Sequence, residues 1–160
     1  MGFQNTVNFQ QAPAVAGDFA TANPRASFPA GEGQYVADAA GVTVGRFAWI
    51  NATTGLVSNT GTGKPDGFIH REQQALISTY LAEYSNLIPQ GFAVTVMRTG
   101  DYWATATVAA ATKGQKVFAK LSDGTVQAGA AGATIAGFIE TDFFITQGCA
   151  LNELAVITKD

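Results

Sequence analysis

The stretch VTVMRTGDYWATATV, residues 94–108, combines β-branched and aromatic residues with a turn signal. Valine, threonine, tyrosine and tryptophan favour strands, and the TGD tripeptide (99–101) between them is typical of a turn. We therefore expect a hairpin in which VTVMR (94–98) pairs with YWATATV (102–108). Such a hairpin is a building unit of an all-β barrel or sandwich.

The same pattern extends over most of the chain. From about residue 34, short β-prone runs alternate with Gly, Asn and Asp turns, and the Asp–Gly step in KVFAKLSDGTVQAG (116–129) predicts another hairpin. One segment, QQALISTYLAEYSNLIP (73–89), differs, because its apolar residues recur at helical spacing. A short helix there is weighed evenly against an irregular strand, so the predicted fold is mainly β with one short helix as an open alternative.

Residues 1–30 differ in composition from the rest of the chain. They contain three of the five prolines and only two charged residues. Because proline forbids a continuous helix and interrupts a central strand, we expect an extended N-terminal arm, followed by a single β domain over residues 31–160. The arm would lie over a neighbouring subunit or pack on its own barrel. Its candidate interface residues are Phe3, Phe9, Phe19, Arg25 and Phe28.

Composition narrows the function classes. Charged residues make up 13% of the chain, about half of the usual fraction, and the net charge is −3. A surface with so few charges favours association, which indicates a component of an assembly. Because no basic run occurs, we expect no nucleic-acid binding. No window approaches the roughly 18 consecutive apolar residues of a membrane span, so we expect a soluble protein that does not bind membranes.

The chain offers little that resembles catalytic chemistry. His70 is the only histidine and lies two residues before Glu72, but neighbours of this spacing share one face of any strand, so a polar solvent face explains them. Cys149, the only cysteine, is flanked by small and apolar residues, which indicates a buried small side chain. The loop NTGTGKPDG (59–67) lacks the spacing of a phosphate-binding loop and is interpreted as a surface turn. We predict no catalytic, cofactor or metal site and no enzyme activity.

Six strings in a fixed order resemble the capsid cement, or head decoration, proteins of tailed bacteriophages. They are QQAPAVAGDFATANPR (10–25), VTVGRFAWI (42–50), DGFIHREQQA (66–75), IPQGFAVTVM (88–97), GDYW (100–103) and KGQKVFAKLSDGTV (113–126). The resemblance runs over most of the chain. Its specificity comes from the order and spacing of the strings, because none of them is a chemical signature.

The resemblance implies a jelly-roll-like domain on the outer surface of a virion. Such a protein would clamp adjacent major capsid subunits and stabilise the DNA-filled head, with the major capsid protein and further copies of itself, as a dimer or trimer, as partners. It would need no cofactor and would be made in the cytoplasm of the host bacterium. The alternative function is a β-sandwich binding module for a glycan or a host receptor, in which Trp49, Tyr102 and Trp103 would form a stacking platform.

Overall fold

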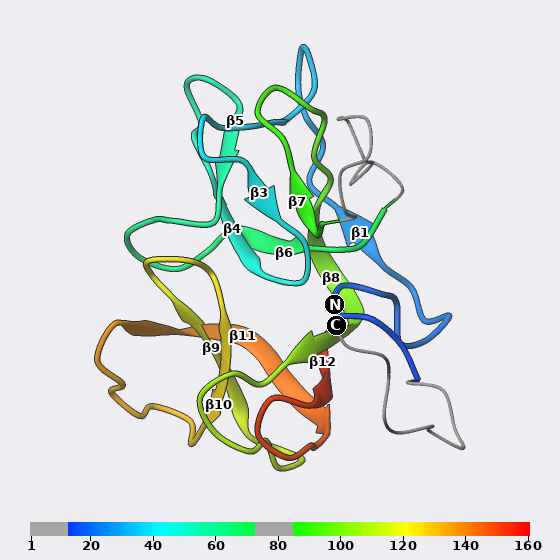
Figure 1. The fold of residues 1–160 in the computed structure, drawn as a ribbon, viewed down its shortest axis with the longest axis vertical. Helices are drawn as coiled ribbons and strands as arrows, with labels where there is room; N and C mark the ends of the chain where they lie inside the picture. The colour runs from blue at the N-terminus through cyan, green and yellow to red at the C-terminus, as the bar shows by residue number, and fades with distance from the viewer. Residues whose placement is uncertain (1–12, 73–84) are drawn as a thin grey trace, which may run out of the picture.

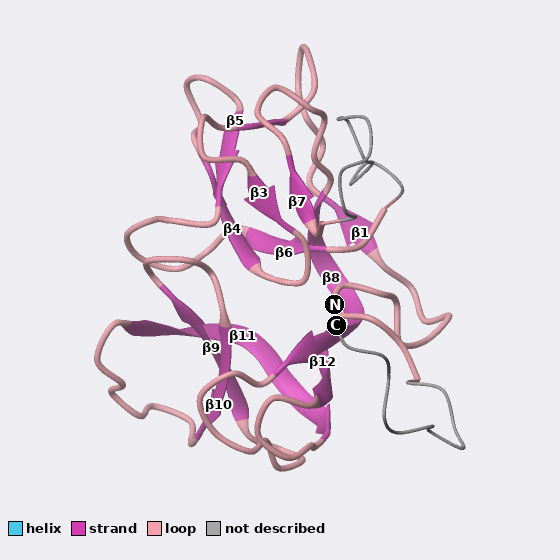
Figure 2. Cartoon of the chain, in the orientation of Figure 1, coloured by secondary structure: helices cyan, strands magenta, loops and turns pink. Residues whose placement is uncertain are grey.

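The structure is a computed structural model that describes residues 13–72 and 85–160. Over these ranges the chain forms twelve strands and no helix, so the prediction of a mainly β fold is confirmed. Figure 2 shows that long loops join most of the strands. The described residues contain no helix that could cross a membrane.

The strands fall into two groups, which occupy the upper and lower parts of Figure 1. The upper group is made of short strands: β1 (Ala26–Ser27), β2 (Val36–Ala37), β3 (Val42–Thr43), β4 (Phe47–Ile50), β5 (Leu56–Ser58), β6 (Gly67–Ile69) and β7 (Leu87–Ile88). Below them lie β9 (Lys116–Lys120), β10 (Val126–Gly129), β11 (Phe138–Gln147) and β12 (Leu154–Lys159), and β8 (Val96–Thr105) runs between the groups.

The strand pairings join both groups into one sheet. The order is β10-β9-β11-β12-β8-β6-β4-β5-β2, with β1 added on β8, while β3 and β7 form a separate pair. The predicted hairpin at the Asp–Gly step is confirmed, since β9 and β10 pair in antiparallel register. The sheet therefore has a single strand, β8, through which the upper and lower parts are connected.

The hairpin predicted at TGD is wrong, because β8 continues through it as one strand of ten residues. Thr99 pairs with Ala26 of β1, and Gly100 pairs with Lys159 at the end of β12. These distant partners satisfy the backbone of the tripeptide, which removes the need for a turn. The N-terminal end of β8 pairs with β6 and its C-terminal part with β12, so the strand passes from one part of the molecule to the other.

Of the two alternatives predicted for residues 73–89, a short helix or an irregular strand, the strand is found at the C-terminal end of the segment. Leu87 and Ile88 form β7 and pair with Thr43 and Val42 of β3. Cross-strand pairing and the burial of Ile88 outweigh the helical spacing of the segment there. The rest of the expected helix, residues 73–84, lies outside the described residues.

The buried apolar residues form two clusters, one of which spans both parts of the molecule. In this larger cluster Phe68 of β6 packs against Tyr102 of β8, with ring centroids 5.1 Å apart, and Phe143 of β11 lies beside both. The second cluster fills the upper part, around Val57 and Ile69. The two parts thus share a core and are not separate units.

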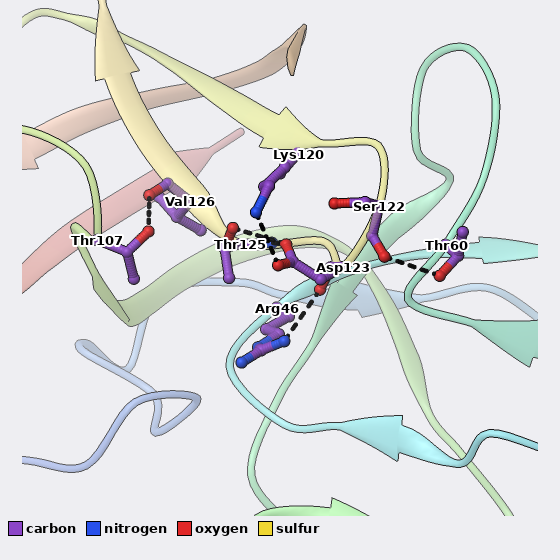
Figure 3. Close-up of polar contacts among 8 residues, drawn as sticks. All are labelled: Arg46, Thr60, Thr107, Lys120, Ser122, Asp123, Thr125 and Val126. Atoms are coloured by element: carbon purple, nitrogen blue, oxygen red, sulfur yellow. Dashed lines mark hydrogen bonds and ion pairs between the residues drawn. The ribbon is translucent and has the colours of Figure 1, made fainter. Parts of the chain in front are cut away.

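Hydrogen bonds connect the upper and lower parts at a second place, which we call the polar joint. The turn between β9 and β10 reaches up to the loops around β4 and β5, as Figure 3 shows. The hydroxyl of Thr60 donates a hydrogen bond to the Ser122 carbonyl (3.0 Å), and the guanidinium of Arg46 donates one to the Asp123 carbonyl (3.3 Å). The upper and lower parts are therefore tied at β8 and again at this turn.

Candidate functional site

The N-terminal segment, defined here as residues 13–28, runs antiparallel along β8. The amide of Gly17 donates to the Trp103 carbonyl (2.7 Å), and the amide of Trp103 donates back to the Asp18 carbonyl (2.9 Å). At the other end the amide of Phe28 donates to the Val96 carbonyl (2.9 Å). Of the two arrangements expected for the arm, this part adopts the one on its own domain, and residues 1–12 lie outside the described residues.

A buried carboxylate fastens the middle of this segment. Asp101 of β8 is 7% exposed and accepts hydrogen bonds from the Thr21 hydroxyl (2.5 Å) and the Asn23 side-chain amide (2.7 Å). Burial raises the pKa of Asp101. Hydrogen bonds from Thr21, Thr158 and Asn23 together lower the pKa by more than burial raises it, so it lies below its ordinary value. The ionised carboxylate is thus the form that holds the segment on β8.

Phe19, two residues before Thr21, is part of an aromatic stack. The ring of Phe19 stacks on the His70 ring, with centroids 4.7 Å apart, and contacts Tyr102 at 5.6 Å. His70 is only 7% exposed, so the predicted solvent face is wrong: the N-terminal segment covers this end of β6. Its Nε2 contacts the Glu72 carboxylate, while its Nδ1 is buried with no hydrogen-bond partner among the described residues. The ring of Phe19 covers His70, which explains the burial of the histidine.

The five predicted interface residues are placed very differently. Phe3 and Phe9 lie outside the described residues. Phe19 and Phe28 are half-buried and pack against the two core clusters. Arg25 is exposed, with its guanidinium 3.9 Å from the centroid of the Phe19 ring. Contact of these residues with another subunit or with a shell stays a prediction.

The stacking platform predicted for a glycan or receptor module is wrong. Tyr102 is fully buried beneath Phe19. Trp49 donates its indole N–H to the Gly63 carbonyl (3.0 Å), and a Cβ added at Gly61 would lie 2.3 Å from its ring. The glycine-rich loop therefore lies on Trp49, and glycine is needed at position 61 for this close approach.

Cys149 lies far along the chain from this stack, in the loop between β11 and β12. Its thiol donates to the Glu153 carbonyl at 3.3 Å, and burial raises its pKa. A thiol with a raised pKa is a weak nucleophile at neutral pH. Over the described ranges no group of three or more His, Cys, Asp and Glu side chains is arranged to hold a metal ion.

The hydrogen bonds from Thr21 and Asn23 to Asp101 were not predicted from the sequence. The TGD tripeptide predicts a turn, which would place Asp101 in solvent. Its partners Thr21 and Asn23 precede it by 80 and 78 residues, and no local pattern links them. The arm-like composition of residues 1–30 is the single sequence signal that this segment needs a surface to lie on.

Six large apolar side chains of the described residues are exposed, and five of them belong to the upper and lower groups of elements in Figure 1. At the upper end they are carried by β5, β7 and the loop after β7; at the lower end they lie in the loops between β8 and β9 and between β11 and β12. They are Leu56, Leu87 and Phe92 at the upper end and Val108 and Leu151 at the lower end, each between 39% and 51% exposed. The sixth, Val15, is 42% exposed and belongs to the N-terminal segment.

Comparison with known proteins connects this architecture to phage shells. The family model of the XM1 gp53 minor capsid protein matches residues 3–159. A chain in the solved capsid of Myoviridae phage XM1 has a similar fold, with a TM-score of 0.67 and 23% sequence identity over 99% of this chain and 97% of that one. No curated protein sequence matches the chain.

Proposed function

Since the chain belongs to the XM1 gp53 minor capsid protein family and is thus a structural protein of a phage capsid, we propose that it acts as a cement protein. It would lie on the outer surface of the shell and clamp adjacent major capsid subunits, as a homo-oligomer. The load that it opposes is the pressure of packaged DNA.

The observation that carries this proposal is the pair of apolar ends. A clamp needs two contact surfaces that face different subunits, and five of the six exposed large apolar side chains belong to elements of the upper and lower groups. Burial of one large apolar side chain contributes about 1.5–3 kcal/mol, so a few at each end form a modest contact. Two modest contacts on one rigid body bind at high effective concentration and resist separation of the subunits.

The test adds purified protein to closed, undecorated capsids, because binding to a closed shell requires an outer site. Two variants each introduce acidic residues at one end: Leu87→Asp with Phe92→Asp, and Val108→Asp with Leu151→Asp. Thr62→Asp, at an exposed position of the glycine-rich loop, is the matched control for added charge. Pelleting measures attachment, and the temperature at which the shell opens measures clamping.

Each one-end variant should lose the rise in opening temperature that the wild-type protein confers, even at concentrations where it still pellets with shells. Thr62→Asp should behave like the wild type. If both one-end variants stabilise shells as well as the wild type, the two ends do not form the clamp. If the wild-type protein fails to pellet with closed shells, it is not an external cement protein.

A further inference from the structure

The nine Lys and Arg side chains of this protein differ in their partners. Four of the nine Lys and Arg residues contact a carboxylate: Lys64, Arg71, Lys120 and Lys159. Arg25 and Arg98 instead contact aromatic rings, and no described carboxylate lies within ion-pair distance of either. Arg46 donates to a backbone carbonyl, and Lys113 and Lys116 have no ion pair with the described residues, so Arg25 and Arg98 are distinguished by their contacts with aromatic rings of the N-terminal segment.

The guanidinium groups of both arginines lie against phenylalanine rings of the N-terminal segment, although Arg98 itself belongs to β8. The Arg25 guanidinium lies 3.9 Å from the centroid of Phe19, and that of Arg98 lies 5.8 Å from the centroid of Phe28. A guanidinium over a ring uses its face for the contact and keeps its N–H edge free for hydrogen bonds. Both residues are exposed, so solvent reaches their side chains.

Strand pairing brings the two arginines close together. Ala26 pairs with Thr99 and Ser27 with Met97, so Arg98 is the additional residue of a bulge, and Arg25 directly precedes β1. A Cβ at Gly100 would lie 3.0 Å from the Arg25 Cβ, which places Arg25 opposite Gly100 and two residues from Arg98. Together, Arg25 and Arg98 form a surface feature that we name the arginine patch.

No described residue covers the arginine patch. All residues from Thr21 to Ser27 are exposed, and Arg98 is exposed beside them. The segment that carries Arg25 is fixed on both sides, by Asp101 through Thr21 and Asn23 and by the β1–β8 pairing. A guanidinium held in advance loses less side-chain entropy when it binds than a free one.

We propose that the arginine patch binds a carboxylate-bearing segment of a protein partner, and, resting on the proposed function, that this partner is an acidic Asp/Glu segment on the outer face of the major capsid subunit. The fork of a guanidinium matches a carboxylate in two parallel charge-assisted hydrogen bonds. Two arginines at neighbouring positions of paired strands fit a segment that carries more than one carboxylate. Nucleic acid fits less well, because its binding relies on many phosphate contacts and this chain has a net negative charge.

The test compares three proteins by pelleting with undecorated capsids in low salt. The first variant is Arg25→Gln with Arg98→Gln, which keeps the stems and removes the charge. The second is Arg25→Lys with Arg98→Lys, which keeps the charge and removes the fork. Lys113→Gln is the matched control, since Lys113 is exposed in a loop and has no ion pair in the structure. Urea unfolding of each variant shows that the fold is retained.

The glutamine pair should weaken attachment at least about tenfold, as removal of charged interface partners does, while Lys113→Gln changes it less than about twofold. The lysine pair should lie between them, because a point charge replaces a bidentate one. Attachment that depends on the patch should also weaken as salt rises. If wild-type protein pellets and the glutamine pair pellets equally well, the patch proposal is overturned while the cement function stands.

A second experiment separates the two proposals if the protein does not bind shells at all. Hexaglutamate peptide is titrated into the isolated protein, and the arginine Nε–H resonances are followed by NMR. Selective shifts of the Arg25 and Arg98 signals that disappear in the glutamine pair would support carboxylate recognition. If a single-stranded DNA oligonucleotide shifts them at lower concentration than hexaglutamate, or if neither ligand shifts them, the assignment to an acidic protein segment is overturned.

Discussion

Replacement of Gly124 by alanine should open the joint between the two parts of the molecule. Gly124 lies in the β9–β10 turn with φ +69°, and its carbonyl accepts a hydrogen bond from the Phe47 amide at 2.8 Å. A Cβ at this position would lie 2.2 Å from the Phe47 carbonyl oxygen, well inside van der Waals contact with a backbone atom. The turn would therefore have to withdraw from β4.

The magnitude follows from three contributions. Alanine in the left-handed region costs about 1–2 kcal/mol. The lost amide hydrogen bond costs about 0.5–1.5 kcal/mol. Forced backbone displacement of the kind that overpacking causes adds about 1–3 kcal/mol. The free energy of unfolding should therefore fall by about 2.5–6.5 kcal/mol, a large part of the stability of a domain of this size.

Gly132→Ala is the matched control. Gly132 has a similar φ of +73°, but no heavy atom lies within 4 Å of its added Cβ, so the conformational cost of about 1–2 kcal/mol acts alone. Urea unfolding measures both variants, and hydrogen exchange at the Phe47 amide reports on the joint itself. If Gly124→Ala loses no more stability than Gly132→Ala, the close approach at the joint does not stabilise the fold and the reasoning is refuted.

Two further predictions concern the segment along β8. Asp101→Asn should lower the free energy of unfolding by about 1.5–3 kcal/mol at neutral pH, since hydrogen bonds to a charged group are lost. Because the folded pKa of Asp101 lies below its ordinary 3.8, its contribution is present above that pH and is lost as pH falls through the folded value. Urea titrations should therefore show the difference between wild type and Asp101→Asn shrinking below about pH 4, and a difference independent of pH would contradict this. His70→Ala should cost about 1–3 kcal/mol, because the ring is buried against Phe19, yet leave pelleting with shells unchanged. Loss of pelleting with the fold intact would place His70 in the interface.

Local chemistry accounts for the features that could be predicted from the sequence. The turn at Asp123 and Gly124 forms where expected because its interactions are between near neighbours. The Asp123 carboxylate accepts hydrogen bonds from the amide and hydroxyl of Thr125, two residues on, and Gly124 adopts the positive φ that the turn needs. The β content has the same origin, since strand-forming residues and turn residues alternate along most of the chain. Composition and the order of the six strings likewise indicated a capsid-associated family.

Tertiary contacts decided the course of β8 and the state of the residues beside it. TGD is as good a local turn signal as the one at Gly124, yet it lies inside a strand because β1 and β12 supply partners for its backbone. His70 is buried because Phe19, fifty-one positions earlier, stacks on it, and Asp101 is buried and ionised because Thr21 and Asn23 reach it across 80 and 78 positions. The free energy that settles each of these features comes from contacts between residues far apart in the chain, and such contacts exist only once the fold has brought them together.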